Sequence, residues 1–205
     1  KAYLEGFYYK PRIDKELLRE YSEGLVALSG CLSGEVPYLI SQDRLDDAIR
    51  TAGEYREIFG KERYFFEVQE NGVAQQQVVN RGLQEMAQRM GVPLVATNDC
   101  HYLQKGDAKV HDILLCLQTG KTLNEPNRMR FHTDQLYVKS TEEMLAAFRD
   151  WPDAVWNTSL VAELCNVEFT FGTYHLPDYR VPEGETLDSY LDKLALRGLA
   201  DRLRE

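Results

Sequence analysis

The sequence predicts an α/β protein in which parallel strands alternate with helices. Short apolar runs at 25–28, 64–68 and 93–96 have the length and residue types of buried strands. Between them lie amphipathic segments, above all 45–59, where apolar residues recur every three or four positions. This alternation is typical of a parallel sheet or barrel with helices packed outside it, and active groups are expected at the carboxyl ends of the strands.

The first elements expected are a helix and a strand. Asp14 is a favourable N-cap and predicts a short helix through Tyr21. Gly24 would end this helix. The run Leu25 to Leu28 then forms the first strand of the sheet.

Two helices should follow that strand. Ser33 is expected to cap a helix that ends at Ile40. Asp43 is expected to cap the longer helix 45–59, which Gly60 stops.

The central part of the sequence predicts two more strands joined by a helix. The aromatic and branched residues of 64–68 form the first of these strands. After Asn71 and Gly72, a helix from Gln75 to Met90 should lead to the strand at 93–96.

The second half of the chain should be mostly helical. The expected elements are, in order, a helix at 107–117, a polar loop to Arg130, a short strand at 136–139, a helix opened by a capping box of Ser140 and Glu143, a helix from Trp151 to Cys165, an extended linker at 166–186 and a helix at 187–203. We place a domain boundary near Asp150.

Composition narrows the class of protein. With 205 residues, 43% of them hydrophobic, the chain has enough apolar residues for an ordinary folded core, and it lacks a membrane-spanning run. We expect a cytoplasmic protein with its four cysteines as thiols. The formal net charge of -9 argues against a surface that binds nucleic acid unaided, so any DNA contact requires a local patch or another part of a larger protein.

The sharpest candidate site is Asp99 with His101, directly after the strand at 93–96. In extended chain, residues two apart point the same way, and a carboxylate with an imidazole suits Zn, Mn or Fe. A hydrogen-bonded turn is the alternative.

Cys31 follows the strand at 25–28 between two glycines and is either a further ligand or a small buried residue. Glu67 is an acid, a partner of a ligand or, as we prefer, a residue on the exposed face of its strand.

Several strings, taken together and in this order, resemble one family. They are GFYYKPR at 6–12, ALSGCLSGE at 27–35, VATNDCHY at 95–102, LLCLQTGK at 114–121 and YHLP at 174–177. The family is the alpha subunit of bacterial DNA polymerase III, the C-family replicative polymerase.

The resemblance implies a fold and a set of metal ligands. In that family an N-terminal PHP (polymerase and histidinol phosphatase) domain is a distorted β/α barrel that can hold metal ions through nine ligands. Residues 1–150 would be the C-terminal half of this domain, a partial barrel, and 151–205 a linker and helices leading into the palm. Cys31, Asp99 and His101 match the last three ligands, for Zn or Mn, whereas the first six have no counterpart in this chain.

The resemblance also implies a function. The intact protein would synthesise DNA from dNTPs, with Mg and catalytic aspartates that lie outside this chain, as would contacts with other replicase subunits and the sliding clamp. The PHP site would have a 3′-5′ exonuclease or structural role, and this segment alone would be inactive. The alternative is a stand-alone PHP-type metal-dependent phosphoesterase. Because the first residue is Lys1, we expect a fragment, which would self-associate through a sheet edge left uncovered.

Overall fold

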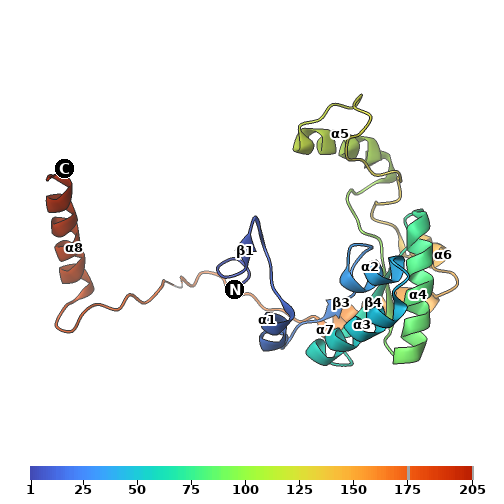
Figure 1. Ribbon diagram of the computed structural model, residues 1–205, viewed down its shortest axis with the longest axis horizontal. Helices are drawn as coiled ribbons and strands as arrows, with labels where there is room; N and C mark the ends of the chain where they lie inside the picture. The colour runs from blue at the N-terminus through green and yellow to red at the C-terminus, as the bar shows by residue number, and fades with distance from the viewer. Residues whose placement is uncertain (175, 205) are drawn as a thin grey trace. The chain divides into compact units, whose positions relative to one another are not determined.

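The computed structural model describes residues 1–174 and 176–204. The chain forms two compact units, Lys1–Asn166 and Val167–Glu205 (Figure 1). His175, which falls in the expected linker, lies outside the described residues.

The first unit is built on a parallel sheet of three strands, in the order β3-β4-β5. The strands are β3 (Ala27–Leu28), β4 (Tyr64–Gln69) and β5 (Leu94–Thr97), and each coincides with a predicted apolar run. Glu67 pairs with Val95 and Gln69 with Thr97 in the parallel register. The α/β class with parallel strands is therefore confirmed, with an open sheet of three strands in the described residues.

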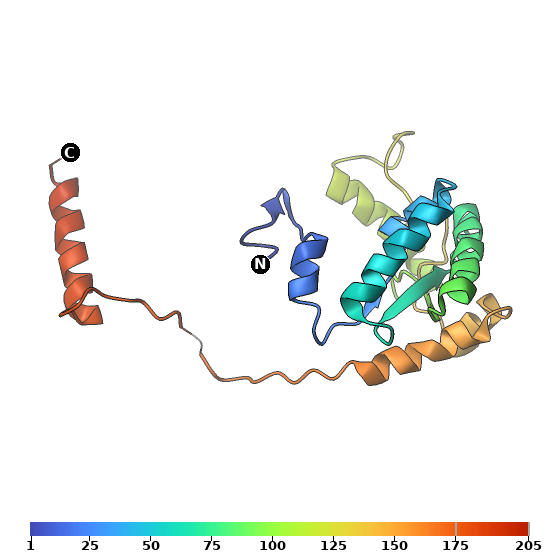
Figure 2. The same cartoon turned by 60° about the horizontal axis from the view of Figure 1, so that its bottom comes forward.

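Helices connect and cover these strands. The first unit contains α1 (Lys15–Glu20), α2 (Glu35–Ser41), α3 (Leu45–Phe59), α4 (Ala74–Met90), the short 3-10 helix η1 (Lys105–Asp107), α5 (Ala108–Thr119), α6 (Thr141–Ala147) and α7 (Pro152–Leu164). Helix α2 packs against both α3 and α4, and these two helices contact β4 (Figure 2). All of these helices except η1 were predicted, with small differences at their ends.

The hydrophobic core lies between one face of the sheet and this helical layer. Phe66, Val68 and Ala96, which point the same way from neighbouring strands, are 0–2% exposed. Val79, Leu83 and Met86 of α4 and Ala154 and Val155 of α7 pack in the same cluster. Because successive strand residues alternate between faces, Glu67 and Thr97 lie on the opposite face.

Two of the predicted helix caps are wrong. The N-cap of α2 is Gly34 rather than Ser33, and that of α3 is Arg44 rather than Asp43; neither makes a side-chain cap bond. Asp43 has φ 57 and sits inside a tight reversal in which Arg44 N donates to Leu39 O at 3.0 Å. The turn therefore places Asp43 one residue too early to cap the helix. Asp14 and the capping box of Ser140 are confirmed.

The strand expected at 136–139 does not form. Only an isolated bridge joins Tyr102 and Tyr137 in this region. The carbonyl oxygens of Gln135 and Tyr137 instead accept hydrogen bonds from the side chain of Asn98, at 3.0 and 2.5 Å. The backbone N–H groups of His101 and Tyr102 also donate to Leu136 O, at 2.8 and 3.3 Å, so the segment is held by a side-chain amide and a short backbone contact.

The first compact unit continues beyond Asp150, where we expected a domain boundary. Helix α7 packs on β5, and Asn157 Nδ2 donates to Leu94 O at 2.8 Å. The assignment of 1–150 and 151–205 to PHP and palm regions remains a prediction.

The second unit contains α8 (Leu187–Arg202), preceded by a segment without helix or strand in its described residues. Thr186 and Ser189 form a capping box at the start of α8. None of the helices described is long and apolar enough to span a membrane.

A hairpin near the N-terminus was not predicted. Strands β1 (Phe7–Tyr8) and β2 (Lys10–Pro11) pair in antiparallel fashion around a single residue, Tyr9.

Candidate functional site

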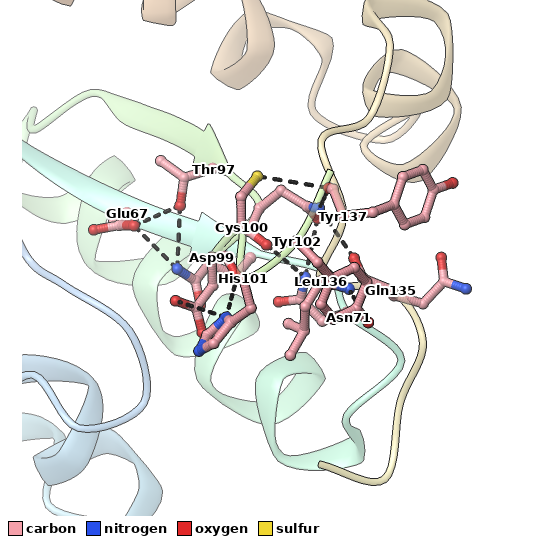
Figure 3. Close-up of polar contacts among 12 residues, drawn as sticks. Glu67, Asn71, Thr97, Asp99, Cys100, His101, Tyr102, Gln135, Leu136 and Tyr137 are labelled. Carbon is pink, nitrogen blue, oxygen red and sulfur yellow. Dashed lines mark hydrogen bonds and ion pairs between the residues drawn. The ribbon is translucent and has the colours of Figure 1, made fainter. Parts of the chain in front are cut away.

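A layer of polar side chains crosses the carboxyl end of the sheet. Thr97 Oγ1 donates to Glu67 Oε1 at 2.5 Å, and Gln69 Nε2 lies 3.0 Å from the same oxygen and 3.1 Å from Thr97 Oγ1. Ser29, just after β3, accepts the backbone N–H of Glu67 at 2.9 Å. Glu67 is therefore not the solvated residue of an exposed face that we preferred. Its carboxylate connects β4 with Thr97 of β5 (Figure 3). Thr97 lies two residues before Asp99.

Asp99 and His101 lie close together in the turn that follows β5. His101 Nδ1 is 3.9 Å from Asp99 Oδ1 and 2.7 Å from the carbonyl oxygen of Asp99. A carbonyl oxygen only accepts, so in this contact Nδ1 carries the hydrogen. In this tautomer Nε2 presents its lone pair, the arrangement in which histidine binds a metal while its other nitrogen donates.

The turn is fixed by a buried network of amides that the sequence did not reveal. Asn71 is 0% exposed, and its Nδ2 donates to the backbone oxygen and Oδ1 of Asn98. Gln76 binds Asn71 through both its oxygen and its nitrogen, at 2.9 and 2.7 Å. Thr133 Oγ1 donates to Asn71 O at 2.6 Å. Asn71 therefore holds Asn98, which precedes α5, and Thr133, which follows it, against the end of the sheet.

Lys139 completes this network with a positive charge. Its Nζ donates to Asn98 Oδ1 and Gln135 O, both at 2.7 Å, and lies 5.0 Å from the centre of the Tyr137 ring. Burial lowers the pKa of Lys139 below its usual value. The only signal for this network in the sequence is that Asn71 and Asn98 each follow a buried strand.

An aromatic group covers the imidazole of His101. The ring centre of His101 is 5.3 Å from that of His111 and 4.8 Å from that of Phe131. His111 lies in α5 and also meets Tyr102, at 5.6 Å. Arg128 holds the loop after α5 through a bidentate pair with Asp112, at 2.5 and 2.6 Å. His111 is thus a packed residue of this group.

Cys31 lies in the turn that follows β3. It is partly buried and lines a small cavity together with Glu67, Gln69 and Asn80. In residues 1–174 and 176–204, no group of three His, Cys, Asp or Glu side chains is placed to hold a metal ion. A complete centre does not fit this arrangement, and the assignment of Cys31, Asp99 and His101 as ligands stays a prediction.

Comparison with known proteins shows which family the sequence resembles. The PHP domain family matches residues 1–71. DNA polymerase III subunit alpha of Treponema pallidum is 46% identical over 98% of this chain, and that of Thermus aquaticus is also 46% identical over 98%. The subunit of Borreliella burgdorferi is 42% identical over 99%. The chain spans 17–18% of the length of these relatives. The chain is therefore similar, along nearly its whole length, to a segment of DNA polymerase III subunit alpha, and its residues 1–71 match the PHP domain family.

Proposed function

We propose that this chain is part of a DNA-directed DNA polymerase, a nucleotidyltransferase that extends DNA from dNTPs during replication. The observation that carries the proposal is the identity of 42–46% to three polymerase subunits over 98–99% of the chain. We infer a cytoplasmic protein whose contacts with template, dNTPs, other replicase subunits and the sliding clamp are made largely by regions outside this segment.

Within such a polymerase, the segment would supply structure around a PHP site rather than the residues of nucleotidyl transfer. The sheet, its polar layer and the amide network hold the turn of Asp99 and His101 in one position. Mg for polymerisation would bind outside this chain. The divalent ion of the PHP site, Zn or Mn, would take Cys31, Asp99 and His101 among its ligands, with donors from elsewhere completing the centre.

Primer extension by the complete gene product tests the polymerase proposal. The product containing this chain should incorporate dNTPs on a primed template, whereas the chain of 205 residues alone should not. The subunit of Thermus aquaticus serves as the positive control. A folded complete product that incorporates no dNTP where the control is active would contradict the proposal.

A stand-alone PHP-type phosphoesterase is the second candidate, and the match of residues 1–71 to the PHP domain favours it. Against it stands the absence of a three-donor group in the described residues. Hydrolysis of p-nitrophenyl phosphate and of a labelled oligonucleotide by the isolated chain, with Zn or Mn, distinguishes the two. Activity that Asp99→Ala abolishes and that Asp46→Ala, a change at an exposed residue of α3, retains would favour the phosphoesterase.

A further inference from the structure

The hairpin of β1 and β2 presents aromatic side chains to solvent. Tyr8 and Tyr9 are 66% and 83% exposed, and their rings meet edge to face with centres 4.7 Å apart. Phe7 and Tyr3, with ring centres 5.4 Å apart, are also exposed. Four exposed aromatic rings within seven residues are unusual for a surface with no partner.

The residue at the tip of this hairpin is strained. Tyr9 has φ 58, in the left-handed region where glycine and asparagine are favoured and a bulky residue is an outlier. No buried contact compensates, because the ring of Tyr9 is mostly exposed. Strained residues of this kind are concentrated at functional sites, where the side chain itself is required.

Cations flank the exposed rings. The guanidinium carbon of Arg12 lies 5.8 Å from the centre of the Tyr8 ring, and Lys10 pairs with Tyr8 across the hairpin. Glu5 is engaged by Lys1 at 2.6 Å, and Asp14 accepts the N–H of Leu17 as helix cap. Within the described part of the chain, neither Lys10 nor Arg12 has a carboxylate within 4.0 Å.

The base of the hairpin is firmly built. Arg12 N donates to Gly6 O at 3.1 Å, and a Cβ on Gly6 would lie 2.0 Å from Arg12 O, so this close approach requires glycine. Helix α1, which follows, is tied to the helical layer by Lys15, whose Nζ binds Glu54 at 2.7 Å and Glu35 at 3.1 Å. In both views the hairpin lies beyond α1, away from the three-stranded sheet (Figures 1 and 2).

We propose that the hairpin at residues 7–11, with Arg12, is a binding site for single-stranded nucleic acid, in which bases stack on Tyr8 and Tyr9 while Lys10 and Arg12 contact phosphates. Aromatic rings interleaved with cations bind single strands with little sequence preference, because every base has a face that can stack. Glu5, Asp14, Glu16 and Glu20 line the hollow beside Arg12, so the phosphate contacts would come from Lys10 and Arg12 individually and not from a broad basic surface. The site depends on the hairpin and not on polymerase activity.

Fluorescence anisotropy of a labelled oligo(dT) of about 20 nucleotides tests the proposal with the whole chain. We expect binding on the order of 10–100 µM at low salt, weakening as salt rises. Tyr9→Gly should weaken it about 5- to 150-fold, the loss expected for one stacked base. Because glycine tolerates φ 58, this variant should unfold at the same urea concentration as the parent or a higher one. Lys10→Gln removes one phosphate contact. The slope of log affinity against log salt concentration should therefore become shallower by about 0.7.

Tyr38→Ala is the matched control, because Tyr38 is 53% exposed on α2, outside the hairpin. Its oligo(dT) affinity should equal that of the parent. Equal affinities of parent and Tyr9→Gly, or no binding by the parent, would overturn the proposal. So would a change in sedimentation, without a change in DNA affinity, in Tyr9→Gly, since that indicates that the hairpin contacts a second copy of the chain. Each of these outcomes leaves primer extension by the complete product unaffected and so is distinct from failure of the proposed function.

Discussion

Asn71 donates from its Nδ2 to both the backbone oxygen of Asn98, at 3.0 Å, and its Oδ1, at 2.9 Å. The two residues follow β4 and β5 and lie 27 positions apart in the sequence. A buried amide pair therefore joins the ends of these strands directly before Asp99. The position of the candidate metal ligands depends on this pair.

Replacing Asn71 by Ala should destabilise the protein by about 2–3 kcal/mol, because the oxygens of Asn98 and the side chain of Gln76 then lose a buried partner. Urea unfolding followed by circular dichroism measures the change. Gln88→Ala, an exposed change on α4, should alter stability by less than about 0.5 kcal/mol. An equal effect of the two variants would show that the amide network contributes nothing to the fold.

The elements that the sequence predicted well are those whose signal is local. The helix 45–59 is defined by periodicity, and the capping box of Ser140 by residues three positions apart. Asp99 and His101 were paired on the assumption of extended chain, whereas Asp99 has φ 47 and the two side chains meet in a turn. In contrast, the hairpin around Tyr9 was missed because tyrosine is not a residue that predicts a left-handed turn.

What the sequence could not reveal are contacts between distant segments. The bond between Thr97 and Glu67 depends on the register of β4 and β5, and Lys139 reaches Asn98 across 41 positions. A lysine and an asparagine in polar loops are ordinary surface residues until the fold buries them. Cys31 was a candidate ligand because of its glycine turn and its match to the family's ligands; it lines a small cavity with Glu67, and its role as a ligand stays a prediction.

The turn that carries Cys31 should not tolerate a side chain at Gly34. A Cβ there would lie 2.2 Å from Ser29 O and 3.1 Å from Cys31 O, both backbone atoms that cannot swing away. Gly34→Ala should therefore cost about 1–3 kcal/mol in urea unfolding. Gly53→Ala is the control, since its Cβ meets nothing within 4 Å inside α3, and it should stabilise by up to about 1 kcal/mol. Similar effects of both changes would mean that the turn adjusts freely.

Metal titration tests the proposed ligands one by one. With Zn²⁺ and a chromogenic competitor, Asp99→Ala and His101→Ala should each weaken binding at least about tenfold, because they remove neighbouring donors. Cys31→Ser should do the same if the three residues bind one ion, and Co²⁺ should then show a thiolate charge-transfer band. Cys165→Ser, an exposed cysteine after α7, is the control. Unchanged affinity in Cys31→Ser would remove Cys31 from the proposed site.

Two tyrosines should make the protein sensitive to alkali. Burial is the main cause that raises the pKa of Tyr64 above its usual value, and burial with the hydrogen bond to Glu35 raises the pKa of Tyr55 to about 12. The unfolded chain loses these protons near pH 10, whereas the folded chain retains them. Their contribution to stability is thus complete below about pH 10 and declines as pH rises toward 12.

Tyr64→Phe separates this effect from packing. The hydroxyl of Tyr64 is buried without a hydrogen-bond partner in the described residues, so removing it should leave stability at pH 7 unchanged or raise it by about 1 kcal/mol. The variant should also lose less stability than the parent between about pH 10 and pH 12, because one phenol no longer resists ionisation. Urea unfolding at a series of pH values measures both effects, with Tyr38→Phe on the exposed side of α2 as control. A Tyr64→Phe variant that is less stable than the parent at pH 7 would show that the hydroxyl has a hydrogen-bond partner in solution. If its stability also falls as steeply as that of the parent above pH 10, ionisation of Tyr64 does not limit stability.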